Sequence, residues 1–307
     1  MVDSHERHEV ETESPGGSRI AAVLWRPGFL VLVVLVVVAT VVVPGIIARL
    51  PELGDREEYQ LSREAVEVVP SPPEWVSEHF LSRVTSSATW PVEGTSVFEP
   101  DLVSRVAESF AQQPWVARVV RVERRIPAGV VVRLEYRQPV AWIETTGESV
   151  AVDVTGVRLP GEDLRGEEWG KLPLVQGVTS EPPATDAVAW EDRGVVAGAR
   201  LAAALEAHWE PFDLESIVVK PDQDRVMLEL VTRGGSRVVW GRPPGTRHPG
   251  ELTVSQKIGR IMQFISRFDS LDPPQGPLEI NIRHWREIIY RPLKSESARS
   301  MTLRVVR

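Results

Sequence analysis

Hydrophobic and polar residues alternate with a period of two between positions 116 and 137, which predicts a β-hairpin. Apolar Val116, Val120 and Val122 alternate with a more polar set, and after a turn at Ile126–Gly129 the alternation resumes. The apolar positions of the second strand are Val130, Val132, Leu134 and Tyr136. Such alternation predicts a sheet with one buried and one charged face. Val120, Val122, Val132 and Leu134 are the predicted core of this sheet.

Two helices are expected before the hairpin. Ser71 can cap a helix, Pro72 suits its first turn, and Glu74 completes a capping box. A second amphipathic pattern begins near Pro100, and a strand is expected over Leu61–Val69. The buried positions would be Val76, Phe80 and Val84 in the first helix, and Val103, Val106, Ala107 and Phe110 in the second. The order strand–helix–helix–strand–strand therefore predicts a small α+β domain over residues 61–137.

Residues 138–292 are predicted to form a second, mostly antiparallel β domain with two helices. One helix buries residues from Val195 to Trp209, and the other repeats apolar residues at +4 and +3 from Val254 to Phe268. Strands are expected at Pro139–Glu144, Glu148–Val152, Ile217–Val219, Val226–Val231, Arg237–Trp240, Leu278–Ile282 and Ile288–Arg291. Residues 293–307 are expected to be a loose tail, although Met301–Val306 could form a short strand.

The apolar run from Phe29 to Ala48 predicts one transmembrane helix, placed at residues 25–48. Twenty residues at about 1.5 Å each span roughly 30 Å, the thickness of the hydrocarbon core. A cleaved signal is the alternative, but the preceding region is acidic and the run ends without a small-x-small cleavage site. Residues 1–24 would then be a tail and 49–60 a linker. Two flanking arginines before the run and three after it leave the orientation open.

Composition argues against several functions. A net charge of −8 does not favour nucleic acid as a main partner. The absence of cysteine excludes disulfides, thiolate metal sites and a cysteine nucleophile. Neither a glycine-rich phosphate loop nor a serine nucleophile motif is present, and the six histidines lack metal-ligand spacing. We therefore predict no catalytic, cofactor-binding or metal-binding residues, and no small-molecule substrate.

Several short strings occur in an order that resembles one family. They are Pro114-Trp115-Val116, Val122-x-Arg124-x-x-Pro127, Pro139-Val140-Ala141-Trp142, Val152-Asp153-x-x-Gly156, Leu172-Pro173-Leu174-x-x-Gly177, Val238-Val239-Trp240-Gly241 and Ile280-Asn281-Ile282-Arg283. Together they resemble the FtsQ/DivIB cell-division proteins over about Phe29 to Arg291. The chain departs from that pattern in having Asn281 for a usual aspartate, Trp240 for a usual leucine, and Tyr136 for a frequent glutamate.

The resemblance implies a single-pass protein of the bacterial inner membrane with a cytoplasmic N-terminus. A POTRA domain and a β domain would lie outside the cytoplasm. By resemblance, the protein is a non-catalytic scaffold that links division proteins and regulates septal peptidoglycan synthesis. Its expected partners are bitopic proteins of the FtsB/FtsL (DivIC) kind. The alternatives are a POTRA-bearing component of protein transport or outer-membrane assembly, and a membrane-anchored cell-wall enzyme, for which no nucleophile or metal set is found.

The expected partner site is the final strand of the β domain. Ile288, Ile289, Tyr290 and Arg291 should form an edge strand whose free N–H and C=O groups accept an added strand. In the resembling family, this end of the domain receives the FtsB-like partner. The alternative is an ordinary closing strand that residues 294–307 cover. Trp285, beside the preceding turn, is a further candidate contact residue.

Overall fold

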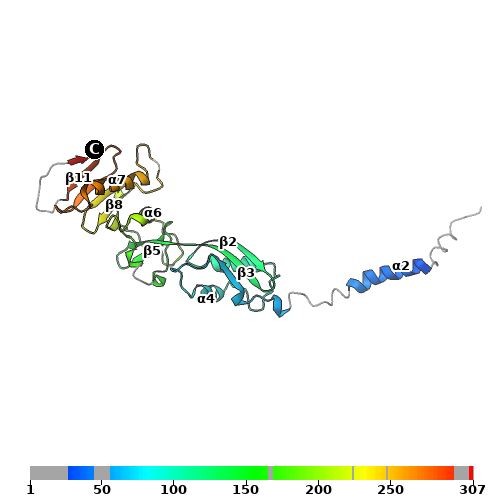
Figure 1. Cartoon of the computed structure of the whole chain (residues 1–307). Coiled ribbons are helices and arrows are strands. Elements are labelled where there is room, and N and C mark those ends of the chain that lie inside the picture. The colour runs from blue at the N-terminus through cyan, green and yellow to red at the C-terminus, as the bar shows by residue number, and fades with distance from the viewer. Residues whose placement is uncertain are drawn as a thin grey trace, which may run out of the picture. The chain divides into compact units, whose positions relative to one another are not determined.

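The computed structural model describes residues 27–44, 56–164, 169–222, 225–246, 248–293 and 304–306. The chain divides into two compact units, Met1–Glu57 and Glu58–Arg307, and the second is an α+β structure built on two sheets (Figure 1). The predicted tail at residues 1–24 lies outside the described residues, and so does most of the linker predicted at 49–60.

The first unit contains a short apolar helix. Helix α2 is Pro27–Val37, and the π-helical segment η1, Val38–Val42, follows it. The 11 residues of α2 extend about 16 Å, roughly half of a hydrocarbon core. In the part of the chain that the structure describes, no helix is both long and apolar enough to cross a membrane. The predicted transmembrane helix at 25–48 is therefore wrong: among the described residues the α-helix α2 ends at Val37, and a π-helical segment follows it.

The second unit begins with a three-stranded sheet and two helices. The strands run in the order β1–β3–β2, with β1 parallel and β2 antiparallel to the central β3. The elements are η3 Glu57–Tyr59, η4 Arg63–Ala65, β1 Val66–Val69, α4 Phe80–Thr85, α5 Leu102–Ala111, β2 Val116–Arg125 and β3 Gly129–Tyr136. Strand β1, the two helices and the hairpin thus follow one another in the predicted order.

Helix α4 begins at Phe80, so the prediction of a helix start at Ser71 is wrong. The segment before it makes three-residue turns, in which Val76 N–H donates to the Pro73 carbonyl at 3.0 Å. The Trp75 indole N–H donates to the Arg137 carbonyl at 2.8 Å and ties this segment to the end of β3. The tertiary contact therefore overrides the local capping signal. Val76, Phe80 and Val84 are nevertheless buried, as predicted.

The hairpin has the predicted pairing but a different pattern of burial on β2. Val130, Val132 and Leu134 of β3 are buried as expected, and Val122 packs against the core. Val120 is 50% exposed, however, and Val119 packs inward in its place. The register shifts twice on β2, the second time between Val119 and Arg121. Such a bulge moves the following residue to the opposite face, so the prediction for Val120 is wrong.

This difference gives a direct test of the strand faces. Aspartate at Val132, which is fully buried, should lower the free energy of unfolding by several kcal/mol because a charge enters an apolar core. Aspartate at Val120 should change it by no more than about 0.5 kcal/mol. Chemical denaturation of the two variants measures both. Equal destabilisation would contradict the bulge.

The second sheet has nine strands in the order β12–β11–β10–β9–β8–β7–β6–β4–β5. Among these described strands, five neighbouring pairs are antiparallel and three are parallel. Their bounds are β4 Pro139–Glu144, β5 Ser149–Asp153, β6 Leu174–Gln176, β7 Leu214–Asp222, β8 Arg225–Thr232, β9 Arg237–Gly241, β10 Leu278–Asn281, β11 Ile288–Pro292 and β12 Arg304–Val306. Short 3-10 turns lie at η5 Gly161–Asp163, η6 Trp169–Lys171 and η7 Glu206–His208.

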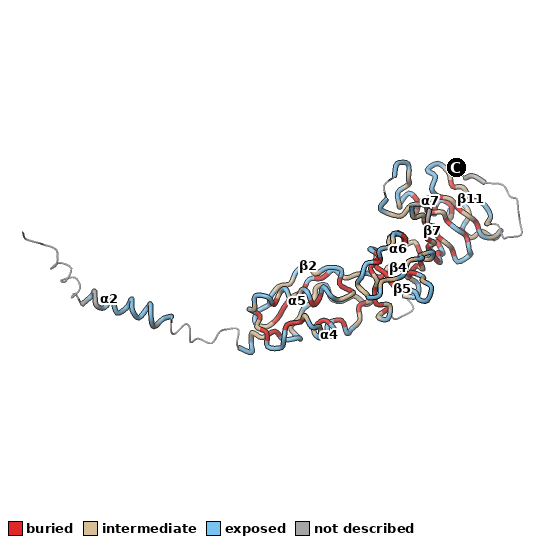
Figure 2. Tube along the Cα trace, turned by 180° about the vertical axis from the view of Figure 1, so that it is seen from behind, coloured by how far each residue is buried: buried red, intermediate tan, exposed pale blue. Residues whose placement is uncertain are grey.

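Two helices pack on the nine-stranded sheet. Helix α6, Arg193–Ala204, is capped by Asp192, and α7, Val254–Phe268, begins with a capping box between Thr253 and Gln256. Buried residues follow both sheets along the chain (Figure 2). The apolar faces of α6 and α7 belong to one core cluster that includes Leu201, Ile261 and the fully buried Trp240. The same cluster contains residues of β9, β10 and β11 and therefore holds these strands in place.

The two sheets are joined within the second unit by a buried ion pair. Arg137, just after β3, contacts the carboxylate of Asp153 at 2.6 Å, and the two side chains are 18% and 6% exposed. The other oxygen of Asp153 accepts from Thr155 N–H and Oγ1 and from Val157 N–H, at 2.7 to 3.0 Å. The carboxylate therefore has partners on both of its oxygens, as a buried charge requires.

Candidate partner-binding edge of the large sheet

A binding protein of this architecture can use the free edges of its sheets. The nine-stranded sheet ends at β12 on one side and at β5 on the other. The β5 edge is covered, because Leu159 N–H donates to the Ala151 carbonyl at 2.9 Å and Asp153 N–H donates to the Val157 carbonyl at 3.1 Å. Among the described strands of the large sheet, β12 therefore offers the open edge.

The small sheet is poorly suited to strand addition. Its outer strands are β1, four residues long with Glu67 in it, and β2. Strand β2 is bulged twice and exposes Arg118, Arg121 and Arg125. Bulges and charged side chains are the usual means by which proteins keep an edge from pairing with another strand. The β11–β12 pairing, by contrast, contains no bulge, because residues 304–306 follow β11 without a register shift.

Strand β11 is not an edge strand, so the prediction of a free edge at residues 288–291 is wrong. It lies between β10 and β12, and Ile289 is opposite Asn281 on one side and Val305 on the other. The chain returns after β11, and residues 304–306 pair with it, which is the covered alternative that the sequence left open. Of the short strand expected within Met301–Val306, the last three positions form β12. A direct role of Ile288, Ile289, Tyr290 and Arg291 in partner binding stays a prediction.

The four predicted site residues, Ile288–Arg291, divide between the two faces of the sheet. Ile288 is buried in the core, and the Tyr290 ring packs edge-on against Phe264 and Phe268 of α7, with centroid distances of 5.6 and 5.3 Å. Arg291, on the other face, contacts Glu279 of β10 at 2.7 Å. The hydrogen bond that Arg291 donates to Glu279 raises the pKa of Arg291 above its usual value. These contacts hold β11 in place as the template on which β12 forms.

Trp285 lies in the connection between β10 and β11 and is 64% exposed. The guanidinium of Arg286 lies 4.4 Å from the centre of the Trp285 ring. The backbone carbonyl of Trp285 accepts a hydrogen bond from Arg260 of α7. An exposed indole held by its backbone loses little entropy on binding, which is typical of interface anchors. The side chain of Trp285 is therefore exposed, and its role as a partner contact stays a prediction.

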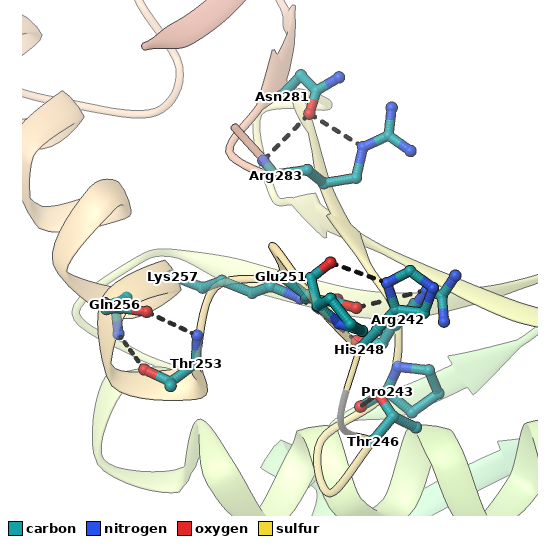
Figure 3. A network of polar contacts seen from close by, with 11 residues as sticks. Arg242, Pro243, Thr246, His248, Glu251, Thr253, Gln256, Lys257, Asn281 and Arg283 are labelled. Atoms are coloured by element: carbon teal, nitrogen blue, oxygen red, sulfur yellow. Dashed lines mark hydrogen bonds and ion pairs between the residues drawn. The ribbon is translucent and has the colours of Figure 1, made fainter. Parts of the chain in front are cut away.

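A buried lysine supports the same end of the sheet. Lys257 of α7 is 3% exposed, contacts Glu251 at 2.8 Å, and lies 5.1 Å from the centre of the Trp240 ring. Glu251 also contacts Arg242, at 3.4 Å, so the loop after β9 is joined to α7 (Figure 3). Burial lowers the pKa of Lys257, and the hydrogen bond that Lys257 donates to Glu251 opposes that effect. Trp240 therefore provides the apolar and cation-binding wall for this charge.

The pKa shift gives stability a definite pH dependence. Because the pKa of Lys257 lies below its ordinary 10.5 in the folded chain, the unfolded chain binds more protons in the window between the two values. The free energy of unfolding contributed by this group therefore rises with pH up to about 10.5. Replacing Lys257 by Met should remove this rise, whereas Lys171→Met on the surface should keep it. Denaturation at a series of alkaline pH values tests this, and an unchanged slope in Lys257→Met would contradict it.

The departures from the family strings have visible consequences. Asn281 accepts hydrogen bonds from the backbone N–H and Nε of Arg283 at 3.2 and 3.1 Å (Figure 3). An amide holds the guanidinium without neutralising it, and the charge of Arg283 helps to lower the pKa of Lys257. Tyr136 donates to the Pro70 carbonyl at 3.3 Å, and burial raises the pKa of Tyr136 to about 12.

The comparisons with known proteins give no family. No family model matches the chain, and no curated protein matches its sequence. The functional argument therefore depends on the geometry of the sheet edge and on the resemblance of the short strings.

The described residues contain no group of three or more histidine, aspartate or glutamate side chains that could hold a metal ion. What the arrangement offers is backbone hydrogen bonding at β12, together with an exposed tryptophan in the connection between β10 and β11. Sequence reasoning missed the supporting residues Arg260, Phe264 and Glu279, because each acts through a partner distant along the chain. The one relevant sequence signal is the helical repeat of apolar residues in α7, which places Phe264 within an amphipathic helix.

Proposed function

We propose that this protein is a non-catalytic scaffold of the bacterial division machinery, with its two-sheet unit outside the cytoplasm. It would bind bitopic proteins of the FtsB/FtsL (DivIC) kind and regulate septal peptidoglycan synthesis through them. The observation that supports this most is the edge of the nine-stranded sheet at β12, which no other described strand covers, at the end of the fold where the resemblance expects a partner strand.

The mechanism is strand addition. A partner segment pairs with the outer N–H and C=O groups of β12, and its alternate side chains select the register. The core contacts of Ile288 and Tyr290 keep β11 in position, so β12 is presented on a rigid template. Trp285 adds an exposed apolar contact at the same end of the sheet.

Crosslinking in living cells followed by purification of the tagged full-length chain tests this function. We expect FtsB- and FtsL-like proteins among the crosslinked partners, and fewer of them with Trp285→Ala. A matched Val92→Ala variant, which also truncates an exposed apolar side chain, should leave the partners unchanged. Recovery of outer-membrane assembly factors in place of division proteins would contradict the proposal.

A further inference from the structure

A cleft of about 500 Å³ opens in the nine-stranded unit, away from the β12 edge. Its walls come from the start of α6, the start of β8 and the loop after β9. The apolar part of its lining consists of Trp190, Val196, Ala197, Val226, Pro243 and Pro244. A cleft of this size with an aromatic ring and adjacent prolines is suited to side chains of an extended peptide.

Four arginines also line this cleft: Arg193, Arg200, Arg225 and Arg242. Arg242 contacts Glu251 at 3.4 Å. For Arg193, Arg200 and Arg225, which are exposed, the described part of the chain provides neither an ion pair nor a hydrogen bond. Within the described side chains, therefore, three guanidinium groups at this cleft lack an ion pair, in a chain whose net charge is −8.

One of the two carboxylates of the lining, Asp192, is engaged by hydrogen bonds within its own segment. Asp192 caps α6 by accepting from Gly194 N–H at 2.6 Å and from Val195 N–H at 3.2 Å. Its second oxygen accepts from Ser180 Oγ, which in turn accepts from the Trp190 indole at 3.0 Å. The charge of Asp192 thus meets the helix N-terminus, and the same bonds fix the Trp190 ring. Glu191 remains as the one other acidic group of the lining.

We propose that this cleft binds an acidic linear segment of a partner protein, one that alternates carboxylate and apolar side chains. Guanidinium groups pair with carboxylates through two parallel hydrogen bonds, and the apolar lining buries the side chains between them. A compact anion would leave the apolar lining uncovered. This second interaction surface is separate from the β12 edge, and it does not depend on the division function.

The test uses the full-length protein and a fluorescent synthetic peptide that alternates glutamate with leucine and proline. Two matched peptides replace glutamate by glutamine or leucine by serine. The glutamate–leucine peptide should bind, more weakly as salt increases, and both matched peptides should bind at least about tenfold less tightly. Equal binding of the glutamine peptide, no binding of any peptide, or displacement by inorganic phosphate at constant ionic strength would overturn the proposal.

Variants locate the binding within the protein. Arg200→Glu and Arg225→Glu should each weaken binding of the glutamate–leucine peptide by about tenfold or more, and Val196→Ser should weaken it by a smaller factor. Arg237→Glu makes the same charge change at an exposed position of β9 outside the cleft and should bind as the parent does. Unchanged melting temperatures confirm that the exposed variants fold. Parent-like binding by both cleft variants would contradict the assignment.

Discussion

A chain that ends at Leu293 should keep both sheets and capture FtsB/FtsL-like partners at least about tenfold less tightly. The truncation removes β12, whose outer groups are the proposed docking edge, and each lost main-chain hydrogen bond is worth about 1 kcal/mol. The core should persist because Leu293 N–H still donates to the Pro277 carbonyl at 2.9 Å and Tyr290 still packs on α7. Affinity capture with the purified chains measures the loss.

A matched control keeps β12 and changes only the connection to it. Replacing residues 294–303 by a glycine–serine linker of the same length should leave capture of the FtsB/FtsL-like partners unchanged, because β12 still forms the docking edge. The truncation also distinguishes the two strands. If β11 itself were the docking strand, removing β12 would expose it and capture would tighten, and that result would restore residues 288–291 as the site.

Replacing Asp153 by Ala should lower the free energy of unfolding by about 3–5 kcal/mol. The variant leaves the buried Arg137 guanidinium without its carboxylate, and it deprives Thr155 and Val157 of the acceptor for their N–H groups. Losing a partner from a buried pair costs more than the pair contributes, because an uncompensated charge stays in the interior. Urea denaturation of parent and variant gives the difference.

An exposed ion pair provides the comparison for Asp153. Arg118 and Glu135 face each other across the β2–β3 hairpin, and their side chains are 65% and 53% exposed. Glu135→Ala should therefore change the unfolding midpoint little, because water screens such pairs. If Glu135→Ala destabilised the protein as much as Asp153→Ala, burial would not be the reason that the Arg137–Asp153 pair contributes to stability.

The sequence predicted those elements whose signal is local and strongly periodic. The alternation along β3 gives its observed buried positions, and the +4, +3 repeat of α7 gives residues that pack on the core, although of these only Ile261 is fully buried. Local signals failed where tertiary contacts intervene. Ser71 begins a capping-box sequence, but the hydrogen bond from Trp75 to Arg137 holds that segment in turns. On β2, a bulge turns the Val120 side chain to the exposed face of the sheet.

The candidate site was predictable only in part. The sequence placed partner binding at the last strands of the β domain, but no local pattern shows whether a chain returns to pair with its final strand. Three residues, Arg304–Val306, decide which strand is the edge. The arginine cleft was missed altogether, because Arg200, Arg225 and Arg242 are far apart in the sequence and only the fold brings them to one opening.

Hydrogen exchange of the full-length protein with and without a purified FtsB/FtsL-like complex tests the central claim most directly. The outward amides of β12 should become protected on binding, while β2 and the covered strand β5 should exchange as before. This pattern follows if the partner adds a strand to the open edge of the large sheet. Protection confined to β2, or unchanged exchange throughout β12 in the bound state, would contradict the account.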